Sequence, residues 1–166
     1  VYLDGKFLVG KHGVAAELGH IPYFGSTNVC GCGTRACAET HAGGYVLRNI
    51  WKDHYPTEPF CEIFQRYGED PIIQTFIEAM GIRFATELNL FDPDQVILGG
   101  GVVEMAGFPM GRLLGYVREF VRKPYPGEDY ALIRASTVPE IGVAGAGYYA
   151  WDRLAETPAE QEGMEA

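Results

Sequence analysis

The sequence lacks the surplus of basic residues that a nucleic-acid partner requires. It has 13 lysine and arginine residues against 22 aspartate and glutamate residues, for a formal net charge of -9. Because binding to phosphates needs a basic face, this balance argues against a nucleic-acid partner. A small neutral ligand remains compatible with the charge.

Long apolar runs are also missing. No stretch reaches the ~18 consecutive apolar residues of a membrane-spanning helix, and the first residues lack the charged and then apolar pattern of a signal peptide. We therefore expect no membrane partner and no export, and we predict a cytoplasmic protein. The chain opens at Val1 directly in a strand-like pattern, which predicts that it is a piece of a longer protein.

Cysteines are too few for a disulfide scaffold. Only four occur, and three of them, Cys30, Cys32 and Cys37, fall within eight residues. One intervening residue leaves the first two badly placed for disulfide geometry. With His20 upstream, the cluster offers one nitrogen and three thiolates, which is a ligand set for a tetrahedral zinc ion. Three reduced cysteines without metal are the alternative, and the separate Cys61 is expected in the core.

Two carboxylates bracket this cluster. Glu17 shares a short loop with His20, and Glu39 comes two residues after Cys37, in the first turn of a predicted helix. A single cluster favours a binding loop held by metal over a free-standing zinc finger, and fixed acceptors beside it suit recognition of sugar hydroxyls. Both glutamates could instead be surface charges, and Glu39 could simply favour the helix N-terminus.

The hydrophobic pattern predicts one α/β domain without internal repeats. Asp4-Gly5 between two short β-rich runs predicts a hairpin, and Asp70-Pro71 predicts the start of the longest helix, which ends near Leu90. Within DPDQVILGGGV, a short and fully apolar strand precedes three glycines, as in a buried strand of a parallel or mixed sheet. The remaining segments are predicted as helices at 38–53, 59–68, 110–123 and 142–156, and a strand at 130–137.

Two stretches then resemble a known family. AELGH and CGCGTRACAET are similar to the double signature of the ROK family of sugar kinases and sugar-responsive repressors, G-E-x-G-H and C-x-C-G-x-x-G-C-x-E. NLFDPDQVILGGGV is similar to the family's segment before its adenosine contact. The resemblance covers residues 1–155 and implies the carboxyl-terminal domain of an actin-like ATPase (ribonuclease H-like) fold with a zinc-pinned loop. Residues 156–166 are expected to be a loose acidic tail.

The resemblance also implies roles for individual residues. In the family, the residues matching Glu17, His20 and Glu39 contact sugar hydroxyls, and those matching His20 and the three clustered cysteines hold structural zinc. His20 would therefore do both jobs. Ala16 and Ala36 stand where the family usually has glycine, and we expect modest loop changes there without loss of metal. The glycines expected beside the nucleotide are Gly99, Gly100, Gly101, Gly142 and Gly145.

These features predict the carboxyl-terminal half of an ATP-dependent hexose kinase that uses Mg²⁺, acts on D-allose or a related sugar and forms a homodimer. No catalytic residue is expected in this chain, because the phosphate loop and the aspartate base belong to an amino-terminal domain expected upstream. The fragment alone should therefore be inactive. The alternative is the effector-binding domain of a ROK repressor. A zinc-stabilised interaction module is a third interpretation, but it leaves both glutamates unexplained.

Overall fold

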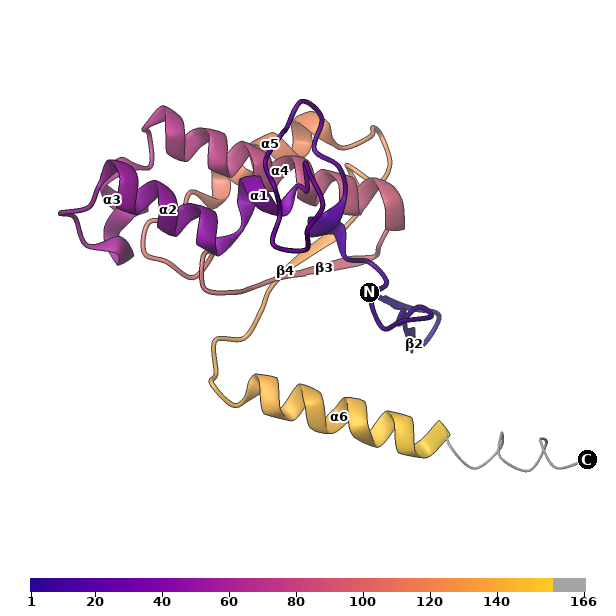
Figure 1. Cartoon of the computed structure of the whole chain (residues 1–166). Helices are drawn as coiled ribbons and strands as arrows, with labels where there is room; N and C mark the ends of the chain where they lie inside the picture. The colour runs from indigo at the N-terminus through magenta and orange to yellow at the C-terminus, as the bar shows by residue number, and fades with distance from the viewer. Residues whose placement is uncertain (157–166) are drawn as a thin grey trace, which may run out of the picture. The chain divides into compact units, whose positions relative to one another are not determined.

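The computed structural model describes residues 1–156, which divide along the chain into two compact units, residues 1–133 and the described residues from 134 onward (Figure 1). Within the described part of the chain, no helix combines the length and apolar character needed to cross a membrane. Beyond Glu156, the loose tail predicted for residues 156–166 lies outside the described residues.

The predicted N-terminal hairpin is confirmed. Strands β1 (Tyr2–Leu3) and β2 (Lys6–Phe7) pair antiparallel, with Tyr2 opposite Phe7. Asp4 and Gly5 both have positive φ, 50° and 78°, which a two-residue hairpin turn of type I′ requires. The rings of Tyr2 and Phe7 meet edge to face at 5.1 Å, so the hairpin carries its own small apolar contact.

The helices follow the predicted order with one break. Gly43 has an extended backbone, φ -91° and ψ 159°, so the single helix expected over residues 38–53 is wrong and two helices form. Glycine leaves a helix more readily than other residues because it gains the most backbone freedom on doing so. The helical elements are η1 (Leu18–His20), α1 (Glu39–Ala42), α2 (Gly44–His54), η2 (Phe60–Glu62), α3 (Ile63–Tyr67), α4 (Pro71–Phe91), α5 (Met110–Phe120) and α6 (Ile141–Glu156).

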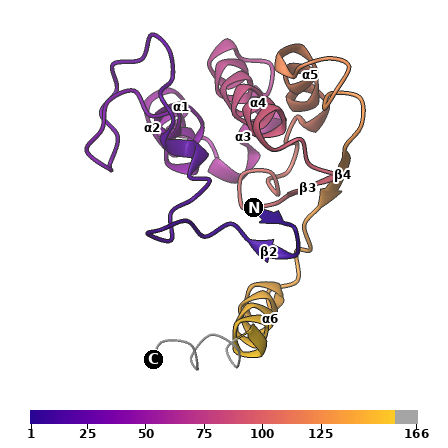
Figure 2. The same ribbon diagram turned by 90° about the vertical axis from the view of Figure 1, so that its right-hand side faces the viewer.

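Helix α4 is the centre of the first unit. The Asp70 side chain accepts a hydrogen bond from the amide of Ile72 at 3.0 Å, as expected for an N-cap, and Asp92 ends the helix in the left-handed conformation. Helices α4 and α5 lie side by side (Figure 2). Phe76 of α4 and Leu113 of α5 belong to one buried cluster, so this helix pair supplies most of the core.

The strand predicted to be buried is only half-buried. Strands β3 (Gln95–Leu98) and β4 (Ala131–Arg134) form a two-stranded sheet, separate from the hairpin. Val96 and Leu98 pack against the second buried cluster, formed by α4 and α5, but Ile97 is 67% exposed. Alternate side chains of a strand point to opposite faces, and the helices of the described first unit cover only one of them.

Cys61 is also not in the core, contrary to the sequence prediction. It is exposed on η2, whereas Ile63 is buried and Phe60 packs against Trp51. In a 3₁₀-helix, residues three apart eclipse one another, so Phe60 and Ile63 share the inward side and leave Cys61 outside.

Candidate metal and sugar site

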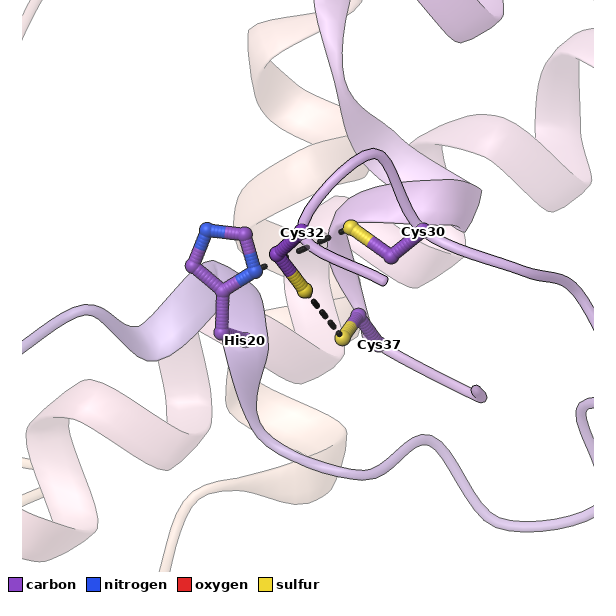
Figure 3. Close-up of side chains that lie close together, drawn as sticks. All are labelled: His20, Cys30, Cys32 and Cys37. Carbon is purple, nitrogen blue, oxygen red and sulfur yellow. Dashed lines mark hydrogen bonds between the residues drawn. The ribbon is translucent and has the colours of Figure 1, made fainter. Parts of the chain in front are cut away.

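Four side chains predicted as metal ligands lie together in the structure. The ligand atoms of His20, Cys30, Cys32 and Cys37 all lie within 4.8 Å of one another (Figure 3). His20 Nδ1 is 3.7 Å from Cys30 Sγ, and Cys32 Sγ is 3.6 Å from Cys37 Sγ. A tetrahedral zinc ion with ligand bonds of about 2.3 Å holds its ligand atoms roughly 3.7 Å apart. The donor set therefore fits zinc in both chemistry and spacing.

The backbone of residues 20–37, here named the metal-site loop, folds back on itself to build this cluster. The amide of Cys30 donates to the carbonyl of Thr34, and the amide of Gly33 donates to the carbonyl of Cys30, both at 2.9 Å. Bridges between Val29 and Arg35 and between Pro22 and Cys37 close the loop. These contacts bring Cys30 and Cys37 to the same place.

Two positions around the cluster adopt a conformation that favours glycine. Ala16 has φ 63° and Ala36 has φ 62°, which is the left-handed region where a Cβ is disfavoured. These are the two positions at which the sequence departs from the glycines of the family signature. The left-handed turns explain why glycine suits both positions, and both alanines adopt them.

The cysteines differ in burial and in acidity. Cys37 is 1% exposed and Cys30 6%, whereas Cys32 is exposed. Hydrogen bonds from Thr34 lower the pKa of the Cys32 thiol to about 6, and burial raises the pKa of the Cys37 thiol to about 12. An ionised Cys32 that accepts a hydrogen bond from a protonated Cys37 is consistent with both directions. Such a negative charge is favourable for a bound cation.

Glu39 is held beside this cluster by several contacts. It is the first residue of α1, and its Oε2 lies 3.3 Å from Nη2 of Arg83 on α4. A Cβ added to Gly19 would lie 2.5 Å from Oε2, and one added to Gly43 would lie 2.7 Å from Oε1. The carboxylate thus sits between two glycines, next to the η1 helix that ends at His20. This arrangement fixes Glu39 relative to His20.

Glu17 lies immediately before the short helix η1 that ends at His20. Its carbonyl accepts a hydrogen bond from the amide of His20 at 2.9 Å. Its side chain is exposed, as is His20, so both side chains are accessible to a ligand. A sugar contact by Glu17, His20 or Glu39 stays a prediction.

Sequence reasoning missed Arg83 and His41. A cation in the middle of the largely apolar α4 is the signal that could have indicated Arg83. His41 is the last basic residue of α1, and its Nε2 lies 2.7 Å from Ser26 Oγ while its ring stacks on Tyr23 at 4.3 Å. Burial lowers the pKa of His41, in line with its place between α1 and the metal-site loop. These contacts attach the loop to α1 independently of any metal.

The glycines predicted beside a nucleotide are accessible. Gly99, Gly100 and Gly101 follow β3, and Gly100 has φ 110°, a conformation that favours glycine. A Cβ added to Gly100 or Gly101 would meet no atom within 4 Å, and the same is true of Gly142 and Gly145 at the start of α6. The two segments belong to separate units, so the nucleotide contact stays a prediction.

The fold is that of the ROK sugar kinases, an actin-like ATPase fold. A ROK hexokinase from Thermus thermophilus is 26% identical, covers 92% of this chain and 53% of its own, and has a TM-score of 0.74. The sequence pattern of the ROK family matches residues 1–153, and the chain belongs to the ROK family.

Relatives of both functional types occur. A glucokinase from Thermotoga maritima is 24% identical over 93% of this chain and 55% of its own length. A ROK transcriptional regulator, described as a homologue of the E. coli MLC protein, is 26% identical, covers 80% of this chain and 37% of its own, and has a TM-score of 0.64. The chain spans about half the length of the curated relatives it matches.

Proposed function

We propose that this chain is the carboxyl-terminal half of an ATP-dependent hexose kinase. The observation that carries the proposal is the placement of Glu39 against the short helix that ends at His20, with Glu17 immediately before that helix. Three polar side chains with two carboxylate acceptors suit the hydroxyls of a sugar better than a charged or apolar ligand. The glucokinase and hexokinase relatives support phosphoryl transfer as the reaction.

Zinc has a structural role in this proposal. His20, Cys30, Cys32 and Cys37 would supply four ligands, which leaves no open coordination position for a catalytic water. His20 directs Nδ1 towards the cluster, so its other ring nitrogen, Nε2, is left to meet a sugar hydroxyl. The metal would thereby set the orientation of a residue that binds the substrate.

The remaining parts of the reaction are assigned to other residues. We propose that the glycines after β3 and at the start of α6 lie beside the nucleotide, with Mg²⁺ neutralising its phosphates. The base that accepts the hydroxyl proton would belong to an amino-terminal domain of the same protein, which the twofold greater length of the relatives supports. A homodimer in the cytoplasm completes the proposal.

The identity of the hexose is a separate proposal. Its basis is a resemblance of the stretches ELGHIP and NLFDPD to family members that act on D-allose. The curated relatives include kinases named for glucose and for N-acetylglucosamine. We therefore propose D-allose or a related hexose, with these two sugars as the comparison set.

The test is an assay of the full-length protein with ATP and Mg²⁺ against D-allose, glucose and N-acetylglucosamine. ATP-dependent phosphorylation of one hexose, in preference to the others, is the expected result. The fragment of residues 1–166, assayed at the same concentration, should show no phosphorylation, because a base and phosphate loop must lie within about 3 Å of the reacting atoms.

The second candidate is the effector-binding domain of a sugar-responsive repressor, which the match to a ROK transcriptional regulator favours. A repressor would bind the hexose by the same side chains without transferring phosphate. Full-length protein that binds a hexose and a DNA operator, but leaves ATP unconsumed, would establish this candidate in place of the kinase.

A further inference from the structure

We infer that Arg83 is a positioning residue for sugar recognition, because it holds the Glu39 carboxylate from the neighbouring helix α4. The inference rests on the proposed function, since it requires Glu39 to contact the sugar. No feature of the family signature includes Arg83, which lies far along the chain from both signature stretches.

Arg83 contacts both ends of α1. Its Nη2 lies 3.3 Å from Oε2 of Glu39, the first residue of that helix, and its Nη1 donates to the carbonyl of Ala42, the last residue, at 3.4 Å. A planar guanidinium can make two such contacts in a fixed relative geometry. Arg83 therefore sets where α1, and with it Glu39, lies relative to α4.

The surroundings leave the Glu39 carboxylate little freedom. Gly19 lies against Oε2 and Gly43 lies against Oε1, each too close for a Cβ. The hydroxyl of Tyr45 donates to the backbone carbonyl of Glu39 at 3.1 Å. Arg83 and Gly19 thus meet the same oxygen, and the other oxygen is bounded by the backbone after α1. A carboxylate restrained in this way is preoriented for a hydroxyl ligand.

A purely stabilising role fits Arg83 less well. The side chains of Arg83 and Glu39 are 22% and 33% exposed, and a partly exposed ion pair of this length adds little to stability. Within the described residues, Arg83 Nε is buried without a hydrogen-bond partner. Arg83 and Glu87 also line a partly open pocket of ≈ 240 Å³, so part of the Arg83 side chain is not packed against other atoms. The ion pair and the hydrogen bond of Arg83 both reach α1.

The test compares Arg83→Met and Arg83→Lys in the full-length protein. Both hexose KM and hexose Kd from calorimetry are measured, with zinc content and thermal stability as checks on folding. Arg83→Met should weaken hexose binding about tenfold, in the range of coupling between neighbouring polar residues, and leave the KM for ATP within about twofold. Arg83→Lys should recover part of the loss, since it keeps the charge without the double contact.

Two controls separate positioning from general damage. Arg112→Met removes an exposed ion pair with Glu69 at another place on the unit and should leave hexose binding unchanged. In a Glu39→Ala background, Arg83→Met should have no further effect on hexose binding, because Arg83 acts through Glu39.

Each outcome decides the inference. Unchanged hexose KM and Kd in Arg83→Met, or a full additional loss in the Glu39→Ala background, would overturn it even if the wild-type protein is an active kinase. If Arg83→Met does not fold, equal hexose binding by Arg83→Lys and wild type overturns it. Absence of hexose phosphorylation by the wild-type protein contradicts the proposed kinase instead, and the calorimetric comparison still decides the role of Arg83.

Discussion

The metal-site loop and the α4–α5 helix pair are held together by different means. Helices α4 and α5 bury large apolar side chains such as Phe76, Ile77 and Leu113, each at most 2% exposed. The loop has three clustered cysteines, a hairpin-like backbone and the contact of His41 with Ser26. Apolar burial is non-directional and tolerates small shifts, whereas ligands must meet at one point. We therefore expect that removal of a single ligand atom disrupts the loop. The helix pair should instead lose stability when a buried apolar side chain is made smaller.

Loss of one metal ligand should have the largest effect on the loop. Cys32→Ser is expected to abolish stable zinc binding, because a hydroxyl does not replace a thiolate ligand. Helix content should change little, because Cys32 is exposed and lies outside the buried clusters of α4 and α5. Metal analysis and circular dichroism of protein purified without chelator measure both effects.

The matched control for this variant is Cys61→Ser, because Cys61 is also exposed but lies outside the cluster. It should keep about one zinc per chain, in line with four-ligand structural sites. Full metal content in Cys32→Ser, or none in the wild-type protein, would contradict the metal site. Chelator treatment of wild type should reproduce the Cys32→Ser result.

A substitution that creates a cavity between α4 and α5 tests whether apolar burial stabilises the helix pair. Phe76 is 2% exposed, so Phe76→Ala should destabilise the protein by about 3 to 5 kcal/mol in urea unfolding. Zinc content of the folded fraction should remain that of wild type. A stability loss under about 1 kcal/mol would show that the apolar cluster is not the main source of stability.

Removal of the Glu39 carboxylate should have an effect of intermediate size, on the kinetics for the hexose and not on zinc content. Glu39→Ala in the full-length protein should lower kcat/KM for the hexose by roughly 1.5 to 3 kcal/mol, or tenfold to hundredfold, the range for hydrogen bonds to charged groups. Glu69→Ala, at an 82% exposed carboxylate, is the control and should leave the kinetics unchanged. Zinc content must equal that of wild type, so that a collapsed loop is not mistaken for a lost contact.

Normal sugar kinetics in Glu39→Ala would mean that Glu39 serves only as a favourable charge at the start of α1. The same result would remove the basis of the inference on Arg83, while leaving the kinase proposal to the activity of the wild-type protein.

The smallest effect on stability is expected at Ala36, where the backbone of the metal-site loop is strained. Ala36 has φ 62°, so Ala36→Gly should stabilise the loop by about 1 kcal/mol, the order of the cost of a Cβ in the left-handed region. Ala38→Gly is the matched control, because Ala38 has an ordinary φ of -55° and the same substitution should lower stability there. Differential scanning calorimetry distinguishes the two signs, and destabilisation by both variants would contradict strain at Ala36.

Much of the fold follows from local sequence signals. Asp70-Pro71 predicts the start of α4 to the residue, and Asp4-Gly5 predicts the first hairpin, because capping and turn chemistry act between near neighbours. The grouping of His20 with the three cysteines was also predictable, since their residue types are those of one coordination sphere.

Other features depended on neighbours that are distant in sequence. The sequence predicted a buried β3 strand and a buried Cys61, and both predictions are wrong. The type of an apolar or small residue does not indicate which face of its strand or helix another element covers. The break at Gly43 follows a local glycine signal, but only the structure shows that the Glu39 carboxylate occupies the space beside it.

The sequence by itself determined most of the order of helices and strands, the grouping of four candidate metal ligands and the family. It did so because capping, turn formation and metal coordination depend on residue type and short spacing. Only the tertiary structure decided that Arg83 meets Glu39 and that two glycines enclose its carboxylate. Those contacts join α1 to α4 and η1 across the fold, and such packing depends on the position of whole helices, which no local pattern specifies.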